Sequence, residues 1–470
     1  MKKIILTFIL VFSFIGLVLS DPFLDQFDQL NVPEIKMPEI SKEVLPNGLK
    51  FYYLPNQELP VFEMQALIEV GSIDESVEKK GLAAVMMELL RTGGSLHTSS
   101  KEIDQTLEQY AMMVSSETHA EFSVFKIRSL AKDAPLAIKL FFELFTEPAF
   151  DEARLNTIKQ AMTDEILRRN ETPSDVAGRE YRQVLFGNES VWARLPGLKT
   201  TSQITRDDVV QFYKNYVGPQ KIWLAVSSQI SKAQILKTIS EYSFSWKNST
   251  IDRTKPAPVV KEWKPGLYVV PQKNTQSALT LGHFGDTRQN PDKYALILAN
   301  YILGGTTFGG RLGSRIRVEL GLAYGAYSAY ALTTDVGAFE MNISTQSQTT
   351  AQALSEAQSV FKNLVTQNYP TDREILDAKK AILTRLIFEL SDPFEIVESQ
   401  VYYDYYGYPP NYLSVYQKKM LAVGKGDIER VLQNYFFPDR LVMVVVGDPE
   451  KMGDLSKIGG AIHTLPLDLD

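Results

Sequence analysis

Arg317 and Tyr324 are the residues of this chain whose types and spacing best suit catalysis. They stand seven positions apart within residues 303–324, LGGTTFGGRLGSRIRVELGLAY. An arginine supplies a permanent charge with a fork of hydrogen-bond donors, and a tyrosine supplies a rigid hydroxyl. Such a pair can hold a peptide carbonyl or stabilise a developing oxyanion.

The sequence around this pair predicts a glycine-rich turn, a short basic helix that carries Arg317, and a strand that starts near Tyr324. The turn has two interpretations, a mobile loop that contacts substrate or a tight turn in close packing, and we favour the first. The predicted substrate-binding residues are Gly304, Gly305, Thr306, Thr307, Phe308, Gly309 and Gly310. A dinucleotide-binding loop is disfavoured, because Phe308 stands where a further glycine is needed.

Plainer interpretations of the pair remain open at this point. Arg317 is then a surface charge paired with Glu319 or Asp286, and Tyr324 is a half-buried strand residue. Spacing alone favours these plainer roles.

Other catalytic groups are scarce in this chain. It has no cysteine and four histidines, of which the closest two, His97 and His119, are 22 residues apart. None of them has a second ligand at helical spacing, so we expect no metal on this chain. The sequence also lacks a G-x-S-x-G nucleophile elbow and a P-loop lysine motif.

Composition limits the partners and the compartment. The net charge of −7 argues against nucleic acid as the main partner. Residues 1–20 join Lys2 and Lys3 to an apolar run that ends at Ser20, which is typical of a secretory signal peptide. A membrane anchor is the alternative, but the run is short for a span. We therefore expect an exported protein of the bacterial periplasm, with no membrane contact after cleavage.

An internal repeat with an offset near 220 residues organises the chain. Asn215-Tyr216 with Pro219 matches Asn434-Tyr435 with Pro438, and the segment from Pro173 to Gly187 matches that from Pro393 to Gly407. A long predicted helix precedes each of the latter segments, at 151–170 and 372–390. The repeat predicts two homologous domains, 40–246 and 265–455, joined by an extended, solvated linker at 247–264.

Each copy mixes strands and helices. In the first copy, strands are predicted at 51–53, 61–70 and 122–128, and helices at 80–90 and 101–110. The fold class is therefore α+β, with two tandem domains that each have a sheet backed by helices. The aromatic run 402–408, YYDYYGY, fits either a peptide groove or rings packed at a helix end, and we favour packing.

The chain resembles the insulinase/pitrilysin-like zinc peptidases, of the short type that includes processing-peptidase subunits. The resemblance covers nearly the whole chain after residue 20. Its first-half motifs are LPNGL at 45–49, VGS at 70–72 and GLA at 81–83. Its second-half motifs are LGG at 303–305, Arg311-Leu312, and Arg317 through the GLAY of 321–324. It implies tandem α+β domains, and pairs of such chains that enclose a peptide in a chamber.

The zinc motif of the family is missing. Active members carry H-x-x-E-H directly after Gly-Leu-Ala, with two zinc ligands and a glutamate that activates water. Here the ligand positions hold Ala84 and Glu88, and the base position holds Met87. Glu165 (or its neighbour Asp164) corresponds to the downstream ligand of the family, and one carboxylate does not make a zinc site.

The resemblance implies a split active site. Arg317 and Tyr324 match the family pair that faces the zinc across the chamber, so this chain is expected to be the non-catalytic subunit of a heterodimeric zinc endopeptidase. A homologous partner would carry the zinc, and peptides would be the substrates. The alternatives are a structural or assembly protein of the same fold and a peptide-binding module that has no peptidase activity.

Overall fold

The computed structural model describes residues 33–253, 258–306, 309–458 and 461–467. The predicted signal peptide at 1–20 lies outside these residues, as do Thr307 and Phe308. Among the described residues, no helix is long and apolar enough to cross a membrane.

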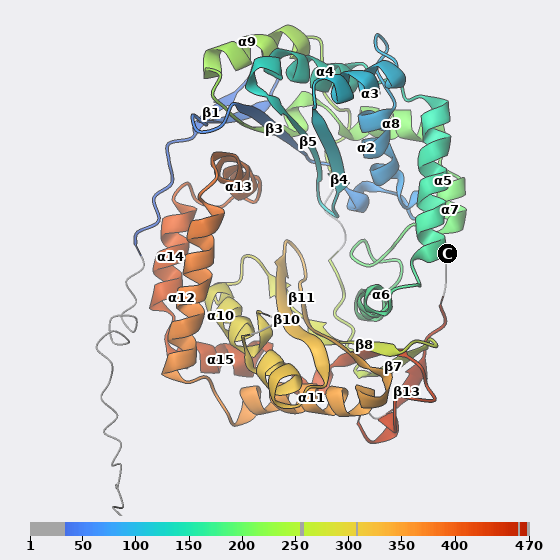
Figure 1. The fold of residues 1–470 in the computed structure, drawn as a ribbon, viewed down its shortest axis with the longest axis vertical. Helices are drawn as coiled ribbons and strands as arrows, with labels where there is room; N and C mark the ends of the chain where they lie inside the picture. Colours follow the sequence, from blue (N-terminus) through green and yellow to red (C-terminus); the bar gives the residue numbers. More distant parts are fainter. Residues whose placement is uncertain (1–32, 254–257, 307–308, 459–460, 468–470) are drawn as a thin grey trace, which may run out of the picture. The chain divides into compact units, whose positions relative to one another are not determined.

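The first half of the chain forms a six-stranded sheet in the order β1-β2-β6-β3-β5-β4 (Figure 1). Strands β2 and β6 are parallel, and all other neighbours are antiparallel. The strands are β1 (Ser41–Val44), β2 (Lys50–Pro55), β3 (Val61–Ile68), β4 (Met113–Thr118), β5 (Ser123–Leu130) and β6 (Ile222–Ser228). The helices are α2 (Leu82–Thr92), α3 (Ser100–Gln109), α4 (Ala134–Thr146), α5 (Glu152–Arg168), α6 (Pro173–Phe186), α7 (Leu198–Ser202), α8 (Arg206–Tyr216) and α9 (Lys232–Ser243).

The second half repeats this arrangement in a seven-stranded sheet, β13-β7-β12-β8-β11-β10-β9. Its parallel pair β7–β12 and antiparallel run β12-β8-β11-β10 match β2–β6 and β6-β3-β5-β4. The strands are β7 (Gly266–Pro271), β8 (Gln276–Phe284), β9 (Asp286–Thr287), β10 (Ala323–Thr333), β11 (Ala338–Gln346), β12 (Val442–Gly447) and β13 (Ile462–Thr464). The helices are α10 (Lys293–Gly304), α11 (Thr350–Thr366), α12 (Asp372–Glu389), α13 (Pro393–Tyr405), α14 (Tyr412–Ala422) and α15 (Lys425–Tyr435). The predicted α+β class with two repeated units is confirmed.

One face of each sheet packs on helices of its own half. Alternate residues of β2 and β3, among them Phe51, Phe62 and Met64, join α2, α4 and α8 in a large apolar core. In the second half, Phe339 of β11 stacks on Phe361 of α11 with ring centroids 5.0 Å apart, and it also contacts Phe436 after α15.

The other face of each sheet is covered by a helix from the opposite half of the chain. Val176, Ala177 and Tyr181 of α6 are fully buried against the second sheet, with Val270, Val444 and their neighbours. Ile396, Val397 and Val401 of α13 pack in turn on Tyr52, Leu67 and Ala225 of the first sheet. Figure 1 shows both exchanged helices beside the sheets that they cover. They are the two matching segments of the sequence repeat.

Local sequence explains where the exchanged helices begin and end. The long helices before them, α5 and α12, start at the capping residues Asp151 and Thr371, whose side chains accept main-chain N–H groups. Pro173 and Pro393 then occupy the first turn of α6 and α13, where a missing N–H costs nothing. Gly187 and Gly407 follow with φ of 87° and 69°, values that glycine adopts easily.

The predicted aromatic run 402–408 divides its rings between two packing sites. Tyr402, Tyr405 and Tyr406 surround Phe122 of the first half, with ring centroids 5.5–6.5 Å apart. Tyr408 stacks on Tyr412 of α14 at 4.1 Å, on the second-half side. These contacts hold α13 against the first half.

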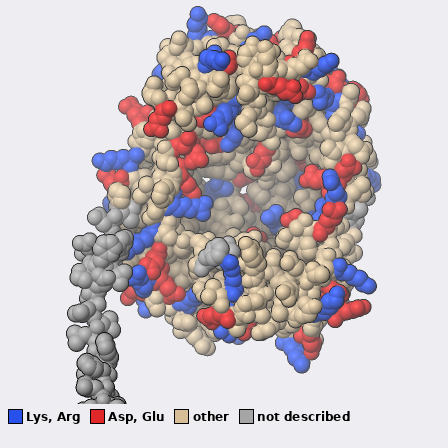
Figure 2. Space-filling view, viewed as in Figure 1, with Lys and Arg blue, Asp and Glu red and all other residues tan. Residues whose placement is uncertain are grey.

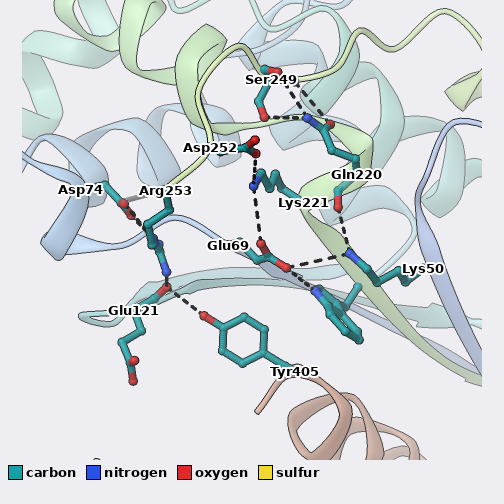
Figure 3. Close-up of polar contacts among 11 residues, drawn as sticks. Lys50, Glu69, Asp74, Glu121, Gln220, Lys221, Ser249, Asp252, Arg253 and Tyr405 are labelled. Atoms are coloured by element: carbon teal, nitrogen blue, oxygen red, sulfur yellow. Dashed lines mark hydrogen bonds and ion pairs between the residues drawn. The ribbon is translucent and has the colours of Figure 1, made fainter. Parts of the chain in front are cut away.

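The linker region 247–264 has no helix or strand among its described residues, but its first part is not loosely solvated. Three polar contacts fix it to the first half: Gln220 with Ser249, Lys221 with Asp252, and Arg253 with Asp74 (Figure 3). The Asp74 side chain is only 3% exposed, so the last of these is a buried ion pair. Arg253 also donates to the main-chain oxygen of Glu121, which accepts the Tyr405 hydroxyl of α13 at 3.2 Å. Residues up to 253 therefore move with the first half.

Candidate functional site

The structure brings Arg317 and Tyr324 together. Arg317 lies on a short π-helical segment, Gly313–Glu319, and Tyr324 lies at the start of β10. The guanidinium carbon of Arg317 lies 5.3 Å from the centroid of the Tyr324 ring, within the range of a cation–π contact. The helix-to-strand placement predicted for the pair is thus observed.

A β-bulge presents Tyr324. In the pairing of β10 with β11, Ala323 faces Thr345 and Gly325 faces Ser344, so Tyr324 is the extra residue. A bulge redirects the side chain of its extra residue and is common beside functional sites. Tyr324 is 84% exposed, and Val318 of the neighbouring segment is 70% exposed.

Two arginines hold the segment that carries Arg317. Arg315 donates to Glu356 of α11 and to Glu319, both at 2.9 Å, so Glu319 is occupied by Arg315. Arg311 makes a two-pronged contact with Glu374 of α12 at 2.8 and 2.9 Å. Burial alone would raise the pKa of Glu374, but the contacts from Arg311 and Thr371 lower it to about 2. The ion pairs of Arg311 with Glu374 and of Arg315 with Glu356 attach the segment and the residues just before it to α12 and α11.

The glycines before this segment serve close packing. A Cβ on Gly304 would lie 2.9 Å from the Ser328 nitrogen of β10, and a Cβ on Gly305 would lie 2.6 Å from the Tyr301 Cα. Gly310 has φ of 109° and approaches Gly304 closely. The Thr306 hydroxyl donates to the Gly309 carbonyl and accepts from the Gly309 N–H, both at 2.8 Å. These contacts fit the tight-turn interpretation, and a contact with substrate stays a prediction.

The positions that correspond to the family's metal ligands lie around a cavity of about 490 Å³ in the first half of the chain. Ala84 and Glu88 of α2 line it together with Glu165 of α5, the three positions that the family resemblance equates with metal ligands. Met87 does not line it, because its side chain is buried in the core at 1% exposure.

Glu88 is already neutralised by a guanidinium. Arg91, one turn further along α2, donates from Nε to a Glu88 oxygen at 2.9 Å and makes a second contact through its terminal nitrogen. The Ser116 hydroxyl also donates to this carboxylate, at 3.2 Å. The donor set therefore does not fit zinc: one ligand position has no donor, and the other is occupied by Arg91.

Arg91 was not among the residues predicted from the sequence to belong to the site. The available signal was its spacing of three residues from Glu88 on a predicted helix, which places the two side chains on one face.

No group of three or more His, Asp or Glu side chains with metal-binding geometry occurs among the described residues. His283 of β8 is fully buried and uses both ring nitrogens structurally, with the Phe284 carbonyl at 2.8 Å and the Phe437 N–H at 3.1 Å. His97 pairs with Glu147 on the surface. Neither is placed beside the cavity that contains Glu88.

The surface charge is mixed. On the face drawn in Figure 2, lysines and arginines alternate with acidic residues over both halves. This face therefore has no large region of one charge, and the attraction of a charged ligand to it depends on individual side chains.

Family models match both halves of the chain. The model described as insulinase (peptidase family M16) matches residues 60–193, and the model described as the peptidase M16 inactive domain matches residues 203–382. Together the matched residues make up more than half of the chain.

Curated relatives and solved structures agree with these matches. A protein of Bacillus subtilis described as an uncharacterized zinc protease, YmxG, is 23% identical over 354 residues, covering 75% of this chain and 84% of that protein. A protein of Helicobacter pylori described as a non-peptidase homolog is 23% identical over 465 residues, covering 96% and 100% of the two chains. The crystal structure of a peptidase M16 inactive domain from Pseudomonas fluorescens superposes with a TM-score of 0.78 at 22% identity, covering 92% of this chain and 100% of that one. With Ala84, Met87 and Glu88 in place of the zinc motif, the chain belongs to the insulinase (M16) peptidase family.

Proposed function

We propose that this chain is the non-catalytic subunit of a heterodimeric zinc endopeptidase that acts on peptides. The observation that carries the proposal is the contact of Arg317 with Tyr324, which is 84% exposed at a bulge. In the same chain the metal-ligand positions hold Ala84 and a Glu88 side chain that is paired with Arg91. The Helicobacter pylori relative described as a non-peptidase homolog supports a chain that is inactive alone.

Under this proposal a homologous partner brings the zinc, and this chain brings Arg317 and Tyr324. The guanidinium and the phenol would hold the substrate backbone and stabilise the oxyanion of the tetrahedral intermediate. Export to the bacterial periplasm through residues 1–20 is part of the same proposal.

The role of the pair is tested in the reconstituted mixture with the zinc-bearing homologue. We expect Arg317→Ala to lower kcat for a peptide about 100-fold, the typical cost of losing one oxyanion donor. Tyr324→Phe should lower kcat by a smaller factor, because the ring and its contact with Arg317 remain. Arg385→Ala on α12, whose side chain is 79% exposed, is the matched control and should leave the rate unchanged.

Unchanged hydrolysis by both Arg317→Ala and Tyr324→Phe would remove the assigned role. Failure of the chain to co-purify with any zinc-bearing homologue would favour an assembly protein or a peptide-binding module of the same fold.

We further propose that no metal binds to this chain, and that two substitutions can restore affinity. Ala84→His with Glu88→His places two imidazoles four residues apart in the cavity that Glu165 also lines, so this variant should bind one zinc ion. A chelating dye and elemental analysis measure the metal, with Ala84→His alone as control. The double variant should remain without hydrolytic activity, since Met87 supplies no base. Stoichiometric zinc in the unaltered chain would contradict the proposal.

A further inference from the structure

The face of the first sheet that α13 covers contains buried polar side chains without hydrogen-bond partners. Alternate residues of β3 and β6 point to this face, and they include Gln65 and, opposite Glu63 in the strand register, Ser227. Both Gln65 and Ser227 are fully buried, yet within the described part of the chain neither side chain makes a hydrogen bond. The Tyr402 hydroxyl of α13 approaches the Gln65 amide without completing one. Such groups are rare in folded proteins, because the cost of removing them from water is not compensated.

Some of the charges around α13 oppose its docking. Glu63 of β3 belongs to the same face, and its side chain is only 14% exposed. Burial raises the pKa of Glu63, and the contact with Arg128 at 3.2 Å lowers it. The charges of Asp392 and Glu398, which α13 brings to this face, raise it further. Docking of α13 therefore places carboxylates of like charge near one another.

The polar contacts that hold α13 are ones that water can replace. The Asp404 carboxylate accepts from the Lys42 ammonium and from the Tyr52 hydroxyl, both at 2.8 Å. Glu398 pairs with Lys126 of β5. The Lys42 and Lys126 side chains are 37% and 42% exposed, and ion pairs with this exposure contribute little to stability. Loss of these contacts to water therefore costs little.

The matching helix α6 is attached differently. Its Tyr181 is fully buried and donates to the Phe339 carbonyl at 2.6 Å. At the 220-residue offset of the repeat, Val401 of α13 stands in its place and has neither the ring nor the hydroxyl. On the sheet face beneath α6, the Thr280 hydroxyl donates to Asn342 at 2.8 Å. The residues that pack with α6 from this sheet are apolar, among them Val270, Ala278, Val442, Val444 and Val446.

We propose that α13 is a releasable cover of the first sheet, whereas α6 is a permanent cover of the second. In the released state, water reaches Gln65 and Ser227, and the like charges around Glu63 separate. The chain therefore has two conformations, which differ in whether this face of the first sheet is covered. Release of α13 does not depend on a peptidase role, since none of these residues belongs to the candidate site.

A single introduced thiol reports the opening of each helix, because the chain has no cysteine of its own. Val397→Cys on α13 and Val176→Cys on α6 are the same change at two fully buried positions. Mass spectrometry follows the modification of each thiol by methyl methanethiosulfonate, whose rate is proportional to the fraction of open molecules. We expect Val397→Cys to react at least about 100-fold faster, since each of the two unsatisfied side chains shifts the equilibrium about tenfold. Equal rates would overturn the proposal.

Gln65→Met tests the cause of the release. It keeps the length of the side chain and removes the amide, so it should slow the reaction of Val397→Cys about 10-fold and leave that of Val176→Cys unchanged. Gln105→Met, at an exposed position of α3, is the matched control and should change neither rate. A Gln65→Met variant in which Val397→Cys reacts as fast as before would contradict the role of the buried amide.

Hydrogen exchange of the unaltered chain tests the same proposal without any substitution. The main-chain amides of residues 393–405 should exchange at least about 100-fold faster than those of residues 173–186. Low concentrations of urea should not change the faster rate, as expected for a local opening. If both helices exchanged at one urea-dependent rate, α13 would open only when the whole chain unfolds, and it would not be a releasable cover.

Discussion

Replacing Tyr181 by alanine will lower the free energy of unfolding by about 3–5 kcal/mol, the usual cost of removing a large buried ring. Tyr181 belongs to the first half of the chain, yet its side chain is fully buried against the second sheet. Its hydroxyl donates to the Phe339 carbonyl at 2.6 Å, so the substitution also leaves a buried acceptor without its donor. Urea denaturation followed by circular dichroism measures the change.

Two further variants show where the loss originates. Tyr181→Phe keeps the ring and should cost about 1–3 kcal/mol, the range for leaving a buried polar group unsatisfied. Phe244→Ala removes an aromatic ring that is 91% exposed and should be nearly neutral. If Tyr181→Ala changed the free energy no more than Phe244→Ala does, α6 would not be an integral cover of the second sheet.

Glu75 and His283 should give the stability of this protein two opposing dependences on pH. Burial raises the pKa of Glu75 to about 7, despite its hydrogen bonds from the Gly81 and Ala83 N–H groups at the start of α2. A carboxyl whose folded pKa lies above the unfolded value of 4.5 contributes stability at low pH, and this contribution is lost as pH rises through about 7. Since one pKa unit corresponds to about 1.4 kcal/mol, the loss is about 3 kcal/mol.

His283 acts in the opposite direction. Burial lowers its pKa from 6.5 to about 4, so its contribution is present above pH 6.5 and is lost as pH falls through about 4. This loss is also about 3 kcal/mol. The two contributions overlap between pH 4.5 and 6.5 and largely cancel in the unaltered protein.

Single variants should reveal each contribution. Glu75→Gln leaves the histidine term alone, so the free energy of unfolding should rise with pH from 4.5 to 6.5. His283→Gln, whose amide can both donate to Phe284 and accept from Phe437, should make it fall with pH. Urea titrations at both pH values measure the slopes, and Glu108→Gln, on an exposed position of α3, controls for the loss of a surface carboxylate. Identical slopes in Glu75→Gln and the unaltered chain would contradict the burial of a titrating carboxyl.

The local features of the candidate site could be predicted from the sequence. The sequence predicted Arg317 on a short helix and Tyr324 near a strand start, but spacing alone favoured plain structural roles for both, and the family resemblance was needed to interpret them as a pair. The sequence also showed directly that Ala84 supplies no metal ligand and that Met87 supplies no catalytic base. The glycines were harder, because a missing Cβ looks the same whether a ligand or another strand approaches. The close approach of Gly304 to Ser328 becomes visible only in the folded structure.

The exchange of α6 and α13 could not be predicted in the same way. The repeat marked Pro173–Gly187 and Pro393–Gly407 as equivalent, and the apolar residues Val176, Ala177 and Tyr181 indicate a buried face. Hydrophobic periodicity shows that a face is buried, but it does not say which sheet covers it.

The exchange of α6 and α13 between the two halves also limits how such a chain can evolve from a single unit. A single unit with this fold would expose the sheet face that its own helix does not cover, and it would carry a helix whose apolar side has no partner. Two such units would cover both of these apolar faces if each lent its helix to the other about a two-fold axis. Gene duplication with a linker turns that intermolecular swap into a contact within one chain, and it frees the two copies to diverge. One copy can then lose its metal ligands while the other keeps an arginine and a tyrosine.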